Sequence, residues 1–423
     1  MQTLINDAHA IIKRTIEANM METSIRDVLR KHKFSDEGDV YIVAIGKASW
    51  TMANAAYCSI GTHIKQGIVI TKYGHSKGAI PHMKIFEAGH PIPDENSLAA
   101  TQEVIDMVKA LRATDEVIFL VSGGGSALFE KPLDGITLED IISINDQLLK
   151  CGADIVEINM VRKRLSAVKA GRFAQICYPV KVFSVILSDV LGDKLDSIAS
   201  GPAVPDMTIS FDVMNVIKKY NISINPVIKK LISDETPKTL ENVETVILGS
   251  VRSLCESAAE CAEGFGYTPL ILTTELRCEA REAGSFIASI ARQVGKDKYS
   301  LKKPSAIIFG GETVVRVKGT GKGGRNQEIA LAAAEGIDGL ENIVIFSLGS
   351  DGTDGPTDAA GGIVDGSSAR RLRDKKIKIS AALADNDSYN ALKKINALIT
   401  TGPTGINLND ISVILSVRGR DEI

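Results

Sequence analysis

The sequence lacks several features that mark common protein classes. Its six cysteines are scattered and form no CxxC pair, and its six histidines show no metal-ligand spacing. This pattern argues against a zinc site or a disulfide framework, and it favours reduced thiols in the cytoplasm. No uninterrupted apolar run reaches the ~18 residues that a membrane span needs, and the N-terminus has no basic region followed by an apolar core. We therefore expect a cytoplasmic protein with no membrane partner.

A large excess of charge of one sign is also absent. The formal net charge is −3, and 24% of the residues are charged beside 44% that are hydrophobic. Nothing at this level favours a nucleic acid partner. What the sequence does contain is apolar material for large cores, together with 37 glycines that concentrate in a few clusters. Those clusters indicate where the chemistry lies.

Short apolar runs alternate with segments of helical periodicity, which is typical of α/β proteins. A length of 423 residues suggests two or three domains. The polar run 234–236 and Pro237 interrupt the pattern, and a new strand begins at Thr245. We therefore predict two α/β domains, residues 1–240 and residues 241–423.

The rest of the chain is organised around the stretch 116–127. Val117–Val121 is a continuous apolar run, as expected of a strand buried on both faces, and Ser122–Ser126 (Ser-Gly-Gly-Gly-Ser) follows at once. Three glycines permit positive φ, and successive backbone N–H groups in such a turn form a concavity for anions. The loop matches neither GxGxxG nor the Walker pattern, so a tight structural turn and a phosphate cradle both remain open.

Two further turns place ionisable side chains just after predicted strands. Lys47 follows the apolar run 40–45, and Asp189 follows the run 180–187. Open α/β sheets bind ligands at the carboxyl ends of their strands. Lys47 is therefore either a ligand-binding residue or a solvated lysine. Asp189 is a Mg²⁺ ligand, an acceptor for a substrate hydroxyl proton, or a helix N-cap.

The second half carries a second glycine-rich loop, Gly319–Gly324, which opens an alanine-rich helix at Arg325. An arginine presents a rigid fork to phosphate or carboxylate, so we expect this loop to bind a ligand. Asp351 follows the predicted strand 343–348 in an acidic, glycine-rich turn. That turn indicates either an oxygen-ligand metal site or carboxylates that cap helices.

A basic segment and one histidine are less specific. The segment 159–172 places five cations around one apolar stripe, as in a solvated basic face or a surface that attracts polyphosphate or an acidic substrate. His90 lies between a glycine and a proline, and we expect it to be solvated or locally hydrogen-bonded.

Taken together, the motifs resemble the glycerate 2-kinase family with a MOFRL-type C-terminal domain, some members of which have carried the label hydroxypyruvate reductase. The resemblance runs from about Ile42 to Leu415. It differs from the usual family pattern at Leu191, where proline is usual, and at Ala170, where a second glycine is common. The segments that carry it are Gly46-Lys47-Ala48, Gly89–Glu95, Ser122–Ala127, Ser188-Asp189-Val190, Ala199–Pro202, Gly323–Glu328, Asp351–Gly361 and Thr401–Gly405.

The resemblance implies a Rossmann-like N-terminal domain with a parallel sheet, a MOFRL-type C-terminal α/β domain, and a reaction in the cleft between them. It implies that the γ-phosphoryl group of ATP, with Mg²⁺, is transferred to the 2-hydroxyl of D-glycerate. It leaves the oligomeric state open, with a homodimer as one candidate. The site residues that follow from it are Lys47, Asp189 and Arg325 as catalytic residues, Ser122, Gly123, Gly124, Gly125 and Ser126 as the phosphate-binding loop, Arg164, Glu312 and Asn326 as substrate-binding residues, and Asp351 with Asp189 as metal ligands.

Two other functions fit parts of the sequence. An NAD(P)H-dependent hydroxypyruvate reductase would suit a Rossmann-like domain and the older family label. Against it, no GxGxxG follows an early strand with an acidic residue ~20 positions further on. A non-catalytic sugar-acid-binding protein would be expected to lack Lys47, Arg325 or the acidic loop, and the sequence retains all three.

Overall fold

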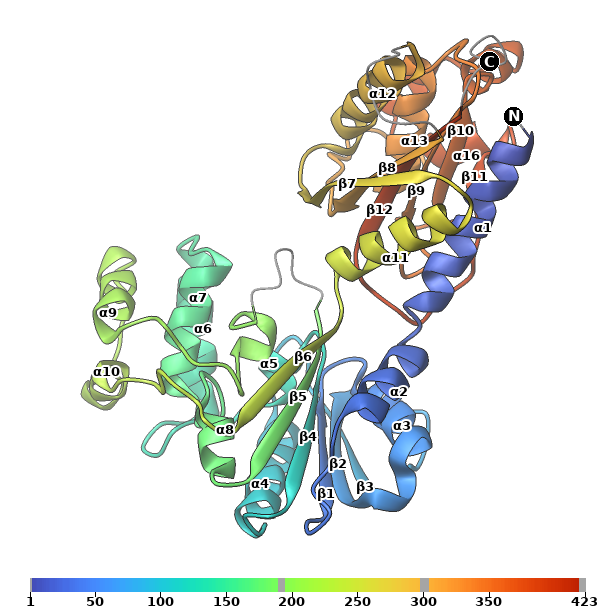
Figure 1. Cartoon of the computed structure of the whole chain (residues 1–423). Helices are drawn as coiled ribbons and strands as arrows, with labels where there is room; N and C mark the ends of the chain where they lie inside the picture. Colours follow the sequence, from blue (N-terminus) through green and yellow to red (C-terminus); the bar gives the residue numbers. More distant parts are fainter. Residues whose placement is uncertain (1, 189–194, 297–303, 418–423) are drawn as a thin grey trace. The chain divides into compact units, whose positions relative to one another are not determined.

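The chain folds into two compact α/β units. The structure, a computed structural model, describes residues 2–188, 195–296 and 304–417. The N-terminal unit comprises Met21–Leu248, and the C-terminal unit comprises Met1–Met20 together with Gly249–Ile423. Each unit contains one six-stranded sheet with helices on both faces (Figure 1). The two-domain α/β architecture expected from the sequence is confirmed.

The sheet of the N-terminal unit has the order β3-β2-β1-β4-β5-β6. Its strands are β1 (Val40–Ile45), β2 (Ile64–Lys72), β3 (Met83–Ala88), β4 (Glu116–Val121), β5 (Lys181–Leu187) and β6 (Val243–Gly249). The pairs β2–β3, β1–β2, β1–β4 and β4–β5 are parallel. The order reverses between β1 and β4, and doubly wound sheets bind ligands beyond the carboxyl ends of the strands at such a switch point. The predicted Rossmann-like sheet is therefore present.

Helices cover both faces of this sheet because its central strands are apolar on both sides. Val43 and Ile45 pack in one core with residues of α4 and α8, whereas α3 packs on β1 and β2 and also contacts α2. The helices α6, α7, α9 and α10 enclose a separate small core and form a lobe of the same unit (Figure 1). The helical segments are α2 (Met21–Lys31), α3 (Ser49–Ile60), η1 (Gly61–His63), α4 (Glu95–Lys109), α5 (Gly125–Leu128), α6 (Leu138–Lys150), α7 (Ile155–Leu165), α8 (Arg172–Cys177), η2 (Ile198–Ser200), α9 (Ser210–Lys219) and α10 (Pro226–Ser233).

The sheet of the C-terminal unit is mixed, with the order β11-β10-β9-β12-β8-β7. Only β7–β8 is parallel among its pairs in the described residues; β8–β12, β12–β9, β9–β10 and β10–β11 are antiparallel. Helices α12 and α13 pack together over one face, and α1 with α11 covers the other (Figure 1). The elements are α1 (Gln2–Ala18), α11 (Val251–Gly264), β7 (Thr268–Leu276), α12 (Ala280–Lys296), β8 (Ser305–Gly311), α13 (Arg325–Gly336), β9 (Ile343–Gly349), β10 (Gly361–Asp365), α14 (Ser368–Asp374), α15 (Ile379–Ala384), α16 (Ser388–Lys393), β11 (Leu398–Ile399) and β12 (Asp410–Ser416).

This division differs from the predicted boundary after residue 240 in two ways. Strand β6 continues the sheet of the N-terminal unit, so the division falls at Leu248. The first helix belongs to the C-terminal unit, because its apolar stripe, including Ala8 and Ile11, is buried there against α11. The hydroxyl of Tyr267 donates a hydrogen bond to Asp7 at 2.8 Å, which joins α1 to the C-terminal unit. Sequence order alone does not reveal that an N-terminal helix packs in the C-terminal unit.

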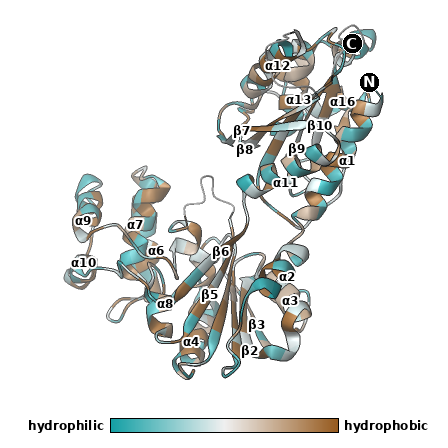
Figure 2. Cartoon of the chain, in the orientation of Figure 1, coloured by the Kyte–Doolittle hydropathy of each residue, from teal (hydrophilic) through white to brown (hydrophobic). Residues whose placement is uncertain are grey.

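Hydrophobic residues concentrate in the strands of both units, and polar residues colour the outer faces of the helices (Figure 2). This is the pattern expected when each sheet is the middle layer of its unit. In the part of the chain that the structure describes, no helix is both long enough and apolar enough to cross a membrane.

Candidate functional site

In the N-terminal unit, two of the predicted ligand-binding turns lie side by side. β1 and β4 run in parallel register and end together at Ile45 and Val121, so the turns that follow them meet. The backbone N–H of Lys47 donates to the carbonyl of Gly123 at 2.9 Å. The hydroxyl of Ser122 accepts from the N–H of Ala48 at 3.1 Å and donates to the carbonyl of Ile45 at 3.2 Å. These bonds join the two turns and commit the Ser122 hydroxyl to structure.

The glycine loop keeps backbone donors available. Among the hydrogen bonds of the described residues, none uses the backbone N–H of Gly123 or Gly124. Gly124 has φ of +86°, a left-handed conformation that turns successive N–H groups toward one side. A Cβ at Gly124 would lie 3.0 Å from the His90 ring and 3.1 Å from Cγ of Lys47. The loop therefore combines two free N–H groups, one lysine and one histidine, which is a set of donors for an anion.

The end of the glycine loop is held by residues of α7 and η2. The hydroxyls of Ser126 and Ser200 are hydrogen-bonded at 2.9 Å, and Arg162 donates to the carbonyl of Ser126 at 2.9 Å. Ser200 has φ of +62° and its hydroxyl also contacts Asn159 at 3.4 Å. The surroundings of Gly125 exclude a side chain, since a Cβ at this position would lie 2.7 Å from Cβ of Ala199. Ser126 and Gly125 therefore have a structural role: they hold the loop in place, and they contribute less than Gly123 and Gly124 to the hydrogen-bond donors for a ligand.

From the sequence, His90 was expected only to be solvated or locally hydrogen-bonded, and the structure places its ring beside Gly124 of the glycine loop. It is half-buried, and burial together with the charges of Lys47, Lys72 and His75 lowers its pKa below the ordinary value. The ring is therefore neutral at neutral pH, and His75 approaches the same turn, with Nδ1 3.2 Å from the carbonyl oxygen of Lys47. The only signal in the sequence was the position of this histidine in a glycine- and proline-rich turn, and solvated histidines occur in such turns as well.

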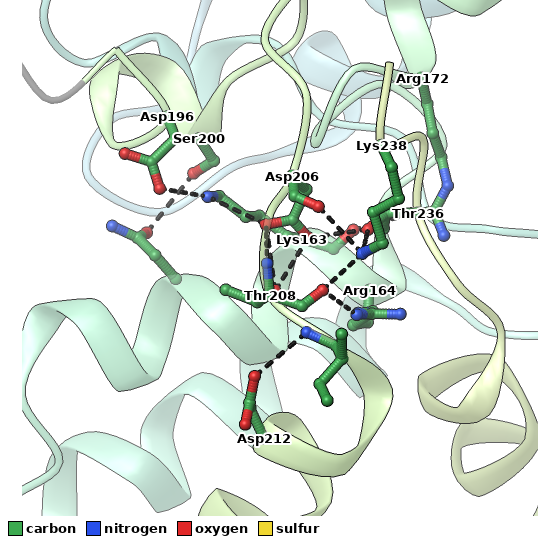
Figure 3. A network of polar contacts seen from close by, with 12 residues as sticks. Lys163, Arg164, Arg172, Asp196, Ser200, Asp206, Thr208, Asp212, Thr236 and Lys238 are labelled. Carbon is green, nitrogen blue, oxygen red and sulfur yellow. Dashed lines mark hydrogen bonds and ion pairs between the residues drawn. The ribbon is translucent and has the colours of Figure 1, made fainter.

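Arg164 has a structural position. It is fully buried, and its guanidinium donates to the carbonyls of Asp234 and Thr208 and to the carboxylate of Glu235, at 2.6, 2.6 and 3.0 Å. Figure 3 shows its guanidinium directed into this network, beside Thr208. A buried guanidinium whose donors reach backbone carbonyls has little left for a substrate, so we leave Arg164 out of the proposed site.

The same network explains the basic segment of the sequence. Lys163 is buried with its Nζ 2.9 Å from Asp196 and 3.6 Å from Asp206 (Figure 3). Arg172 donates to the carbonyls of Lys163 and Ser166 at 2.7 and 2.8 Å. These cations point inward and satisfy carbonyls and carboxylates, so the segment is neither a solvated face nor a polyphosphate surface. Asp189, the remaining catalytic prediction in this unit, lies outside the described residues.

In the C-terminal unit, a cavity of about 560 Å³ brings together Glu312, Arg325 and Asp351. Its other wall is apolar and includes Val314, Val315 and Val317. Asn326 does not line this cavity, because its side chain faces the core. There its amide oxygen accepts from the hydroxyl of Ser347 at 2.6 Å. Three of the predicted residues of this unit therefore meet, and Asn326 supports them from behind.

Arg325 is held by two carboxylates. Its Nε and one terminal nitrogen donate to Asp410 at 2.5 and 3.1 Å, and the other terminal nitrogen donates to Glu312 at 3.2 Å. Burial acts to lower the pKa of Arg325, but the hydrogen bonds and charge of Asp410 raise it, and the net direction is upward. Asp410 was not predicted, although an acidic residue directly before the largely apolar strand segment 411–415 could have indicated a buried partner.

The second glycine-rich loop is closed by the protein itself. Its backbone N–H groups at 318–322 donate to the segment Asp385–Asp387, for example from Thr320 to Asp385 at 2.9 Å and from Lys322 to Asp387 at 3.0 Å. Carboxylate, amide and carbonyl oxygens thus occupy the places that phosphate oxygens would take. These backbone groups are therefore used within the protein, and the expected ligand binding by this segment stays a prediction that depends on residues lining the cavity, Arg325 among them.

The N-terminus of α13 is occupied in the same way. Asp354 accepts from the N–H of Asn326 at 3.1 Å and of Gln327 at 2.8 Å, since Gly324 at the N-cap has no side chain to do so. Burial raises the pKa of Asp354 to about 7, although both N–H groups favour its ionised form. The charged group that the second glycine-rich segment contributes to the cavity is therefore the side chain of Arg325.

The acidic turn offers one carboxylate for a metal. Asp351 lines the cavity, and one of its oxygens accepts from the N–H of Thr353 at 2.9 Å. Within the described residues, no group of three or more His, Cys, Asp or Glu side chains has the arrangement of a metal site. Mg²⁺ commonly binds through one or two carboxylates plus substrate phosphates and water. The residues present therefore fit a metal that arrives with a nucleotide better than one that is held by the protein alone.

Comparisons with known proteins cover nearly the whole chain. Residues 7–233 match the description "Domain of unknown function (DUF4147)", and residues 305–410 match the "MOFRL family". The chain is 53% identical over 407 residues to a D-glycerate 2-kinase of Thermotoga maritima, which spans 96% of this chain and 97% of that protein. It is 42% identical to a glycerate 2-kinase of Pyrococcus horikoshii, over 93% of this chain and 91% of the relative. A crystal structure of glycerate kinase from Thermotoga maritima superimposes with a TM-score of 0.92 at 52% identity, covering 99% of this chain and 100% of that one.

Proposed function

The chain belongs to the glycerate 2-kinase family, and on that premise we propose that it transfers the γ-phosphoryl group of ATP to the 2-hydroxyl of D-glycerate. The observation that carries the proposal is the turn at Gly123 and Gly124. Its two backbone N–H groups, which make no hydrogen bond to any described residue, lie beside Lys47 at the switch point of a Rossmann-like sheet. Such a turn suits an anion with several oxygens, and it contains no GxGxxG arrangement for a dinucleotide.

The residues of the N-terminal unit would bind and neutralise phosphate. Phosphoryl transfer needs positioning and neutralised charge more than covalent help from the protein. The N–H groups of Gly123 and Gly124 bind phosphate oxygens, and Lys47 adds a full positive charge. His90, neutral because its pKa is lowered, adds a hydrogen-bond donor without adding charge. In this assignment Asp189 accepts a hydrogen bond from the substrate hydroxyl, as the resemblance implies.

The residues of the C-terminal unit would bind an anionic group through Arg325, with Asp351 nearby. Mg²⁺ would enter with ATP, where Asp351 and Asp189 are the candidate protein ligands, and it would offset charge on the phosphates. We further propose a cytoplasmic location, supported by six free cysteines, and a homodimer, which light scattering of the purified protein would test.

One assay tests the reaction and its main competitor together. Purified protein is incubated with ATP, Mg²⁺ and D-glycerate, and the product is identified by ³¹P and ¹H NMR. We expect ADP and 2-phosphoglycerate in equal amounts. A parallel reaction with hydroxypyruvate and NADH or NADPH should show no cofactor oxidation. Formation of 3-phosphoglycerate alone, or steady oxidation of the nicotinamide, would contradict the proposal.

A further inference from the structure

The two carboxylates that hold Arg325 have different surroundings. The side chain of Asp410 is 7% exposed, and it takes two hydrogen bonds from the guanidinium. The side chain of Glu312 is 43% exposed, and it takes one bond of 3.2 Å. A buried, doubly bonded pair is costly to break, whereas a half-exposed single contact contributes little. The structure therefore distinguishes a permanent partner from an exchangeable one.

We propose that Asp410 fixes Arg325 in orientation, and that Glu312 is a temporary counter-charge whose place on Arg325 is taken by an anionic group of a substrate. This rests on the proposed function in that it treats Arg325 as a substrate-binding residue. It revises the role that the resemblance suggested for Glu312. The glutamate does not bind the substrate but competes with it.

The geometry of the guanidinium supports this division. An arginine presents two donors on its Nε edge and further donors on its terminal nitrogens. The Nε edge of Arg325 is bonded to Asp410, so a ligand in the cavity can reach only the edge that Glu312 now holds. A carboxylate or a phosphate oxygen matches that edge chemically. The Glu312 carboxylate that is bound there now is chemically similar to the ligand group that would replace it.

The placement on the chain supports it as well. Asp410 is the first residue of β12, which is paired on both sides, with Gly311 on β8 and Gly349 on β9. Its position is therefore set by the sheet. Glu312 follows the last residue of β8, and its backbone is bound through its N–H to Leu276, while its side chain reaches into the cavity. The side chain can rotate away without disturbing the sheet.

The test is Glu312→Gln, which keeps the size of the side chain and removes its charge. Isothermal titration calorimetry measures the Kd of D-glycerate and of ADP separately, so that a carboxylate ligand and a phosphate ligand are distinguished. We expect one of the two Kd values to fall about two- to fivefold, the range of a half-exposed ion pair. Glu335→Gln is the matched control, because Glu335 is an exposed carboxylate at the far end of α13.

The effect must also depend on Arg325. In an Arg325→Ala background, Glu312→Gln should leave both Kd values unchanged, because no guanidinium remains to compete for. Unchanged or weaker binding of both ligands to the single Glu312→Gln variant would overturn the proposal, and weaker binding would make Glu312 a ligand of the substrate. If the wild-type protein shows no kinase turnover but Glu312→Gln still tightens one ligand, the proposed function fails while this inference holds.

Asp410→Asn tests the other half of the proposal. A merely structural role would lower the thermal unfolding temperature and leave the kinetic constants of the folded protein unchanged. A positioning role should lower kcat by about tenfold or more in protein whose circular dichroism is native, because Arg325 loses its fixed orientation. Normal kcat in folded Asp410→Asn protein would remove Asp410 from this role, and the Glu312 titration remains decisive if the variant does not fold.

Discussion

The backbone N–H of Lys47 donates a hydrogen bond to the carbonyl oxygen of Gly123 at 2.9 Å. This bond joins the turn after β1 to the turn after β4, so the backbone of Lys47 is fixed against the glycine loop. Among the hydrogen bonds of the described residues, the carbonyl of Gly123 is used in this one, and its N–H is used in none. The hydrogen bond between Lys47 and Gly123 thus helps to position both the Lys47 side chain and the backbone N–H groups of Gly123 and Gly124.

Gly124→Ala tests whether catalysis depends on the shape of the glycine loop. The added Cβ would meet both His90 and Lys47 at 3.0–3.1 Å, and an alanine resists φ of +86°. We expect kcat/KM to fall about a hundredfold, since a shift of the N–H groups by a few tenths of an ångström or more weakens every phosphate contact. Steady-state kinetics with ATP and D-glycerate measures it.

Gly152→Ala is the matched control for that substitution. Gly152 has φ of +77°, so alanine is strained there too, but no atom lies within 4 Å of the added Cβ. Both variants should lose thermal stability by similar amounts, and only Gly124→Ala should lose activity. Equal loss of activity in the two variants would mean that backbone strain, and not the site, accounts for the effect.

Local pattern was enough to predict the strands, the turns that follow them and the two-domain fold. Val117–Val121 became part of β4, and Ser122–Gly124 became the tight turn that leads into α5 at Gly125, because both depend on neighbours in sequence. The closed state of the second glycine-rich loop could not be predicted in this way. Its partners lie at Asp385–Asp387, about 65 residues further along the chain, and only the fold brings them together.

Burial was the second quantity that the sequence did not reveal. The basic segment had the composition of a solvated face, yet Lys163 and Arg164 point inward, since carboxylates and backbone carbonyls from 196–238 surround them. Asp410 likewise became the main partner of Arg325 only through the pairing of β12 with β8 and β9. Periodicity predicts which face of an element is apolar, but it does not predict a charged pair inside a core.

The stability of the C-terminal unit should depend on pH through Asp354. Burial raises its pKa to about 7 from an ordinary value of 3.8, so between these values the folded chain binds a proton that the unfolded chain has lost. The free energy of unfolding must therefore fall as pH rises toward 7 and then level off. Asp354→Asn cannot titrate. We expect the unfolding temperature of the wild type, relative to this variant, to fall between pH 5 and pH 7, as measured by calorimetry.

Asp358→Asn provides the comparison on the same turn. Its carboxylate is fully exposed, and the hydrogen bond from Tyr389 lowers its pKa, so it is ionised in both folded and unfolded chains above pH 5. The difference between this variant and the wild type should therefore stay constant over the same range. A constant difference for Asp354→Asn as well would show that Asp354 is ionised throughout.

Mg²⁺ should bind together with the nucleotide and not before it. The described residues offer no cluster of metal ligands, and Asp351 contributes a single carboxylate. We expect millimolar Mg²⁺ alone to leave the unfolding temperature unchanged, and Mg²⁺ with ADP to raise it more than ADP alone does. Turnover should vanish in EDTA and return with Mg²⁺. Full activity in metal-free buffer, or a clear shift with Mg²⁺ alone, would contradict this order.

The last prediction concerns Lys47 and Arg325, one from each unit. Charge that acts on the transition state affects kcat more than KM. We expect Lys47→Ala and Arg325→Ala each to lower kcat about 10²- to 10³-fold, the effect of losing one strong electrostatic donor. Arg325→Lys should restore little, because one ammonium group cannot keep both bonds to Asp410 and also reach the cavity.

The controls for this pair are Lys150→Ala and Arg370→Ala, two exposed cations of α6 and α14 whose removal changes net charge equally. Both should retain normal kcat. If Lys47 and Arg325 serve one transition state, the double variant should lose less than the product of the two single losses, because each residue acts fully only when the other is present. Strictly multiplicative losses would mean that the two residues act on separate steps. Near-normal kcat in either single variant, with native circular dichroism, would remove that residue from the active site.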